Sequence, residues 1–152
     1  MTNIFSMNHS QITGEFGEHL VLYWLSKNGF ESVHAQYVGI DIIASRNGKR
    51  LGVSVKSRSR KEGKLDYSLT MGKPTELIKK VKETCLHFAC ELYFAFVIDQ
   101  MDSIKVVITP LEVTEDTYNI STKSSLDWNV LKFEKDNRTS SFEFQRKIKG
   151  SI

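Results

Sequence analysis

A chain of 152 residues can build one domain with a substantial core and is too short for two ordinary domains. Its 40% hydrophobic and 26% charged residues exclude a disordered chain, and the absence of an apolar run of about eighteen residues excludes a membrane-spanning helix. The first residues lack a signal-peptide pattern, so we expect a cytoplasmic protein. Cys85 and Cys90 lie five positions apart in a helix-like segment, a spacing that is poor for a disulfide and agrees with a reducing compartment.

A long amphipathic helix is predicted first, from Gln11 to Asn28, with Gly29 as its carboxy-terminal cap. A short strand is expected from Ser32 to Tyr37. The runs IDIIA (40–44) and LGVSV (51–55) then form a hairpin, because the Asn-Gly pair between them is the strongest short-range turn signal.

The next elements continue the alternation of helix and strand. Leu65–Met71 has the pattern of a further strand, and Pro74 begins a second helix that runs through Ala89. Two strands, 93–99 and 104–110, follow across a polar turn. Later signals are weaker, and two short extended pieces are expected at Leu126–Phe133 and Ser141–Phe144.

The net charge of +3 is unevenly distributed along the chain. Residues 46–64 carry a net charge of +7, with Glu62 as their only acid, so the remaining residues carry a net charge of −4. The basic residues of this segment are Arg46, Lys49, Arg50, Lys56, Arg58, Arg60, Lys61 and Lys64. Concentrated positive charge is typical of a face that meets a polyanion such as nucleic acid, and a solvated loop is the alternative.

The hairpin carries one acid and one base in otherwise apolar strands. Asp41 and Lys56 both lie at the end of the hairpin that is remote from its turn, and strand alternation places Ser54 and Lys56 on one face. A carboxylate in such a position needs compensation. Either Lys56 forms an ion pair with it, or a divalent metal ion binds it, since Mg²⁺ takes one or two protein carboxylates together with water and phosphate oxygens.

These residues resemble the motifs of the PD-(D/E)xK nuclease superfamily, most closely those of its small members similar to Holliday-junction resolvases and YraN. The matching pieces are Gly14-x-x-Gly17-Glu18, Gly39-Ile40-Asp41-Ile42-Ile43-Ala44 and Val53-Ser54-Val55-Lys56-Ser57-Arg58. The resemblance implies an α/β, restriction-endonuclease-like core, a mixed β-sheet flanked by helices in the order α-β-β-β-α-β. One domain, 1–152, is expected, with its core at about 12–110 and a carboxy-terminal extension at 111–152.

The resemblance also implies a site. Asp41 would be the central metal ligand, Glu18 a second ligand, direct or through water, and Lys56 the catalytic lysine. The backbone carbonyl of Val55 would be a further ligand to Mg²⁺ or Mn²⁺.

One position departs from the family pattern, because Ser54 stands where a second acid is usual. A hydroxyl is a weaker, neutral ligand, so three outcomes stay open. The other ligands and water hold the metal, another carboxylate such as Glu15 replaces the missing one, or the site no longer cuts.

Histidines offer further candidates for a general base, namely His9, His19 and His34. His19 adjoins Glu18, but adjacent helical residues do not face each other, so we expect it to be exposed.

Two functions are therefore compatible with the sequence. The first is a Mg²⁺-dependent endonuclease acting on DNA in repair, recombination or defence. The second is an inactive nuclease fold that binds nucleic acid or a protein partner, and a second copy of the chain is a further candidate partner. The residues expected to contact DNA are Arg46, Lys49, Arg50, Arg58, Arg60, Lys61 and Lys64.

Overall fold

The computed structural model describes residues 8–37, 39–60, 66–118, 125–145, 147 and 149–150. No helix in these ranges is long and apolar enough to cross a membrane. The elements in chain order are α1 (His9–Lys27), β1 (Glu31–Tyr37), β2 (Ile40–Arg46), β3 (Lys49–Ser59), β4 (Ser68–Gly72), α2 (Pro74–His87), β5 (Glu91–Asp99), β6 (Ser103–Pro110), α3 (Leu111–Thr117), β7 (Ser125–Asn129), the 3-10 helix η1 (Val130–Lys135) and β8 (Ser140–Gln145).

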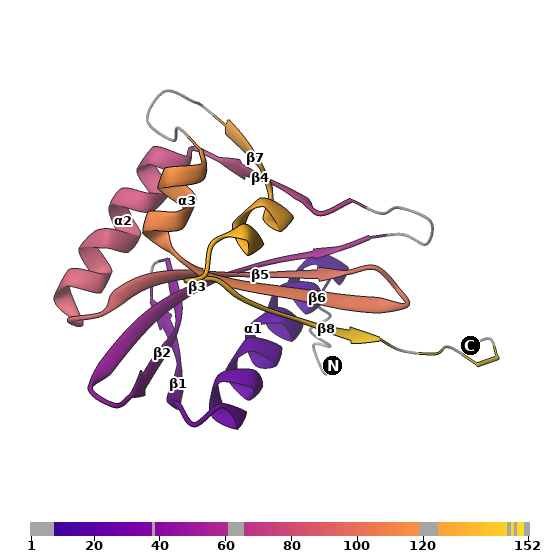
Figure 1. Ribbon diagram of the computed structural model, residues 1–152, viewed down its shortest axis with the longest axis horizontal. Helices are drawn as coiled ribbons and strands as arrows, with labels where there is room; N and C mark the ends of the chain where they lie inside the picture. Colours follow the sequence, from indigo (N-terminus) through magenta and orange to yellow (C-terminus); the bar gives the residue numbers. More distant parts are fainter. Residues whose placement is uncertain are drawn as a thin grey trace, which may run out of the picture.

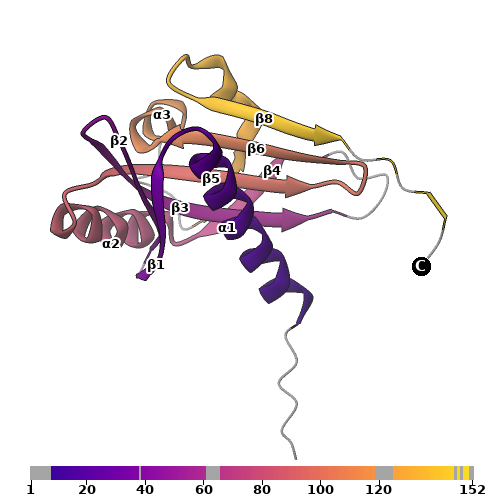
Figure 2. The same ribbon diagram turned by 90° about the horizontal axis from the view of Figure 1, so that it is seen from below.

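Six strands form a mixed sheet in the order β1-β2-β3-β5-β6-β8. The β3–β5 pair is parallel and the other pairs are antiparallel. β4 and β7 form a separate antiparallel ribbon. Helix α1 lies on one face of the sheet, and α2, α3 and the ribbon lie on the other (Figure 1). Figure 2 shows α1 running obliquely across the sheet.

The central strand β5 shows how the sheet separates two cores. Its alternate residues Phe94 and Phe96 pack with α2, α3 and the ribbon, whereas Ala95 and Val97 pack with α1. A strand with helices on both faces needs apolar side chains in both directions, so the run YFAFV is continuous rather than alternating.

The predicted elements up to residue 110 are confirmed within the described residues, with shifts at their ends. Leu65, the first residue of the predicted strand Leu65–Met71, lies outside the described residues, and the strand begins at Ser68. Asn47 and Gly48 have φ values of 51° and 76°, the left-handed backbone that a type I′ hairpin turn requires at both central positions. The β2–β3 hairpin is therefore as tight as the sequence indicates.

Two differences appear beyond residue 110. Leu111–Thr117 is a helix that the sequence did not predict. The predicted extended piece Leu126–Phe133 is a strand only through Asn129, and the prediction is wrong from Val130 onward, where η1 begins. Val130 and Phe133 are both fully buried, and a separation of three residues puts them on one side of a 3-10 helix.

Helix α1 approaches β3 closely at Gly17. A Cβ atom at this position would overlap the hydroxyl of Ser57 on β3. The absent side chain lets α1 lie directly on the strand that also carries Lys56. The next residue of the helix, Glu18, is thereby brought to the sheet.

Candidate active site

The two strands of the charged hairpin separate at Asp41. Their pairing runs from Arg46↔Lys49 at the turn to Ile42↔Val53, and Asp41 lies one residue beyond this last pair. There the Asp41 carboxylate continues the contact between the strands, because the Val55 backbone N–H donates to Asp41 Oδ2 at 2.7 Å. Asp41 is therefore fixed by a side chain-to-backbone hydrogen bond at the point where a gap opens between β2 and β3.

Glu18 and Lys56 both act on the Asp41 carboxylate. Its pKa is raised from 3.8 to about 6, first by burial and then by the charge and hydrogen bonding of Glu18, while the Val55 N–H and the Lys56 ammonium oppose the rise. Glu18 of α1 and Lys56 of β3 therefore both lie within electrostatic reach of Asp41 on β2. A buried carboxylate beside a second carboxylate is an electrostatic arrangement that a cation would relieve.

Lys56 is half-buried, and burial lowers the pKa of its amine. The negative charges of Asp41 and Glu18 raise the pKa of this amine, and the positive charge of Arg58 lowers it further. Lys56 and Arg58 border a hollow of about 260 Å³, whose other walls come from β4, α2, Phe96 and Trp128. The amine therefore stands beside open space large enough for a small polar group.

An Asp41–Lys56 ion pair was the alternative to a metal site. Among the residues that the structure describes, no close ion pair joins these two side chains. Lys56 acts on Asp41 over a longer distance, and the direct hydrogen-bond donor to Asp41 is the Val55 N–H. The ammonium thus leaves the charge on Asp41 largely uncompensated.

His34 of β1, which the sequence offered only as one of three candidate general bases, is a neighbour of Glu18 in the structure. Its Nε2 lies 2.5 Å from Glu18 Oε2, and the two side chains are 23% and 24% exposed. His34 pairs with Ile42 in the β1–β2 register, which puts it on the strand next to Asp41. Residues 18 and 34 share no motif, so only the sheet register and the seating of α1 reveal the pair.

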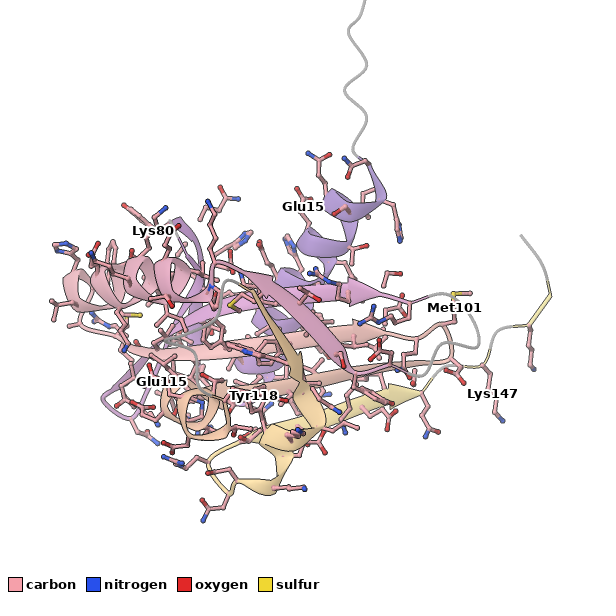
Figure 3. All side chains as sticks on the ribbon, turned by 90° about the horizontal axis from the view of Figure 1, so that it is seen from above. Glu15, Lys80, Met101, Glu115, Tyr118 and Lys147 are labelled. Atoms are coloured by element: carbon pink, nitrogen blue, oxygen red, sulfur yellow. The ribbon has the colours of Figure 1, made fainter. Side chains whose placement is uncertain are left out.

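The position of the missing acid is closed to solvent. Ser54 is fully buried, and its hydroxyl has no hydrogen-bond partner in the described part of the chain. Glu15, the candidate replacement, is exposed near the amino-terminal end of α1 (Figure 3). It is not among the groups that shift the pKa of Asp41, whereas Glu18 is. Glu18 is therefore the second carboxylate at Asp41.

Within the described ranges, no group of three or more His, Cys, Asp or Glu side chains is placed to hold a metal ion. The site instead offers two carboxylates, Glu18 and Asp41. This set still fits Mg²⁺ or Mn²⁺, because Mg²⁺ usually takes one or two carboxylates and keeps several water molecules. Water and phosphate oxygens would have to supply the remaining ligands.

The basic segment divides into two groups along β3. The first, which we call the turn group, comprises Arg46, Lys49 and Arg50. Arg46 Nη1 donates at 2.8 Å to the carbonyl of Asn28, the residue that caps the carboxy-terminal end of α1. Arg50 Nη1 donates at 3.0 Å to the carbonyl of Phe88, the corresponding cap of α2. Lys49 Nζ donates to the Tyr93 hydroxyl at 2.8 Å and pairs with Glu91 at 3.5 Å. Two of these cations thus satisfy carbonyls at helix ends, where positive charge is favourable.

The second group, the strand-end group, comprises Arg58 and Arg60. Arg58 Nη2 donates to the Thr70 carbonyl at 3.3 Å, and Arg60 donates to the Ser68 carbonyl, so both join β3 to β4. Nine residues of strand separate Lys49 from Arg58, which is about 30 Å at roughly 3.3 Å per residue. The strand-end group therefore adjoins Lys56, and the turn group is remote from it. Lys61 and Lys64 lie outside the described residues.

No protein-family model matches the sequence, and no curated protein matches it. Among solved structures, the Holliday junction resolvase Hjc from Archaeoglobus fulgidus is similar over 80% of this chain and 87% of its own, with a TM-score of 0.58 and 18% sequence identity. The bacterial homing endonuclease I-Ssp6803I matches over 80% of this chain and 78% of its own, with a TM-score of 0.46 and 14% identity. The likeness to Hjc shows the fold of this chain, a mixed sheet flanked by helices, which is the restriction-endonuclease-like fold expected from the sequence.

Proposed function

We propose that this protein is a metal-dependent endonuclease that hydrolyses phosphodiester bonds of DNA. The observation that carries the proposal is that the charges of Glu18 and Lys56 both act on Asp41, in a fold shared with a Holliday junction resolvase. A structural hairpin would be more stable with apolar residues at such positions, so the charges need a functional reason. Repair, recombination and defence remain the expected settings.

Each residue has a distinct part in the proposed reaction. Glu18 and Asp41 would hold Mg²⁺ or Mn²⁺ together with water, and the resemblance adds the Val55 carbonyl as a further ligand. The bound ion would supply a more acidic water and neutralise charge on the phosphate. Lys56, whose pKa burial lowers, would accept or orient a proton of the attacking water and stabilise the phosphate oxygens.

The strand-end group is the preferred part of the proposed DNA-contacting face. Arg58 is exposed and follows Lys56 on the same side of β3, where a bound phosphate would lie. Its two hydrogen bonds to carbonyls leave further guanidinium donors for a phosphate. The turn group remains a proposed contact of lower rank, because its cations are engaged at helix ends and with Tyr93 and Glu91.

The test is divalent-dependent cleavage of plasmid and four-way-junction DNA by the wild type, Asp41→Asn and Lys56→Ala. Asp102→Asn and Lys80→Ala, which change an exposed acid and an exposed base that belong to neither the site nor the basic segment, are the matched controls. We expect cleavage by the wild type and both controls in Mn²⁺ or Mg²⁺, none by Asp41→Asn, and little by Lys56→Ala. Equal cleavage by the wild type and Asp41→Asn would refute the proposed site.

The alternative is a nuclease fold that binds DNA or a protein without cutting. The buried, neutral Ser54 favours it, since one negative charge of the family pattern is missing. Salt-dependent binding of DNA by the wild type, without cleavage in any divalent metal, would support this alternative.

A further inference from the structure

Glu18 is held at the site by a residue of a different element. The ring N–H at Nε2 of His34 donates to Glu18 Oε2 at 2.5 Å, from the edge strand β1 to helix α1. Both side chains are mostly buried, so the bond is shielded from water. A hydrogen bond to a carboxylate is shorter and stronger than one between neutral groups.

Glu18 needs such an anchor because its neighbour repels it. Its charge raises the pKa of Asp41, and repulsion between two ionised carboxylates favours a rotation of the longer side chain toward water. A glutamate side chain also has considerable rotamer freedom to lose, worth up to about 2 kcal/mol. One oxygen fixed by His34 counteracts both tendencies and leaves the second oxygen available.

The anchor gains importance from Ser54. Because that position is neutral and buried, Glu18 is the second carboxylate that acts on Asp41. A mobile Glu18 would leave Asp41 as the single charged ligand. The geometry of the Glu18 side chain therefore decides whether the site offers one carboxylate or two.

We propose that His34 is a positioning residue, which keeps the Glu18 carboxylate beside Asp41 so that both bind the same divalent cation. The inference rests on the proposed function and adds to it a residue outside the motifs of the sequence.

His19 provides a matched control within the same cluster. Its ring contacts that of His34, with centroids 5.3 Å apart, but its Nδ1 donates to the backbone carbonyl of Glu15 in the preceding turn of α1. It is the same residue type next to Glu18 in the sequence, yet it does not hold the carboxylate. Its replacement should leave the site intact.

The experiment measures Mn²⁺ affinity by titration calorimetry, without DNA, for the wild type, His34→Leu, His34→Gln and His19→Gln. His34→Leu removes the donor and should weaken Mn²⁺ binding by about 10- to 100-fold, the usual effect of losing a hydrogen-bond partner of a metal ligand. His34→Gln keeps an N–H donor and should recover most of the affinity, and His19→Gln should bind as the wild type does. If His34→Leu does not fold, His34→Phe, which keeps a ring without a donor, replaces it.

Two results would overturn the inference. Wild-type affinity in His34→Leu would mean that Glu18 needs no anchor. Equal losses in His34→Leu and His34→Gln would mean that the imidazole itself is required, as a metal ligand or a base. Asp41→Asn, titrated alongside, separates the two proposals. If Asp41→Asn binds Mn²⁺ with wild-type affinity, the proposed metal site is wrong. If Asp41→Asn loses Mn²⁺ affinity and His34→Leu does not, only the role of His34 is refuted.

Discussion

Asp41 should lower the stability of the metal-free protein at neutral pH. Its pKa rises from 3.8 to about 6 on folding, mainly because burial disfavours the charged form and Glu18 adds repulsion. A carboxyl group with a higher pKa in the folded state binds its proton more tightly there than in the unfolded chain. Its contribution is therefore most favourable below about pH 4, is lost as the pH rises, and stays unfavourable above about pH 6.

The magnitude follows from the two pKa values. At about 1.4 kcal/mol per pH unit, the change from 3.8 to about 6 corresponds to an upper limit of about 3 kcal/mol. Asparagine at this position keeps an oxygen for the Val55 N–H and offers an N–H to Glu18 in place of a negative charge. Asp41→Asn should thus stabilise the metal-free protein by up to about 3 kcal/mol at about pH 7.5, a rise in Tm of about 6–12 °C for a chain of this length.

The assay is thermal unfolding in a chelator across about pH 4 to pH 8, with Asp102→Asn as the control for loss of an exposed acid. The stability difference between Asp41→Asn and the wild type should be absent near pH 4 and grow to its full value by about pH 6. Saturating Mn²⁺ should reverse the order, because only the wild type keeps both carboxylates. A less stable Asp41→Asn at about pH 7.5, or a difference independent of pH, would refute the reasoning.

Three further predictions concern the surroundings of the site. Gly17→Ala should destabilise the protein by about 1–3 kcal/mol, because its Cβ would overlap a hydroxyl of β3. Gly14→Ala has nothing near its Cβ and should raise the free energy of unfolding by up to about 1 kcal/mol. Equal stabilities of the two variants in urea would contradict this. Ser54→Glu puts a third carboxylate at a fully buried position and should therefore lower the Tm of the metal-free protein. The rise in Tm on adding Mn²⁺ should be larger than in the wild type. An unchanged rise would show that position 54 does not face the ion. Arg58→Ala should reduce the slope of log affinity against log salt for duplex DNA by about 0.9. Arg46→Ala, in the turn group of lower rank, should change this slope by less and should lower stability by about 0.3–1 kcal/mol. A larger change of slope in Arg46→Ala than in Arg58→Ala would place the DNA at the turn group.

Much of the fold could be predicted because local signals agree with it. Asn47-Gly48 has positive φ at both residues, as a type I′ hairpin turn requires, and Pro74 begins α2 as expected. Helix α3 was missed because its seven residues, LEVTEDT, are too few to show helical periodicity and include β-branched residues of low helix propensity. Such a segment becomes helical through its contacts, with Leu111 and Val113 in the core.

The candidate site could be predicted only in part. Asp41 and Lys56 belong to one hairpin, so strand geometry alone places them near each other. The bond between Glu18 and His34 depends on the seating of α1 and on the β1–β2 register, which no local pattern encodes. The division of the basic segment depends on the length of β3 and on which carbonyls lie near each arginine.

The most direct test of the central claim is diffraction from crystals soaked in Mn²⁺, with the ion located by its anomalous signal. The account predicts one ion with an oxygen of Asp41 in its coordination shell at about 2.0–2.6 Å. Glu18 should bind the same ion, either directly at a similar distance or through one coordinated water. The account also predicts that Glu18 keeps its hydrogen bond to His34. An ion bound elsewhere, or an Asp41 carboxylate that stays without a cation at saturating Mn²⁺, would contradict it.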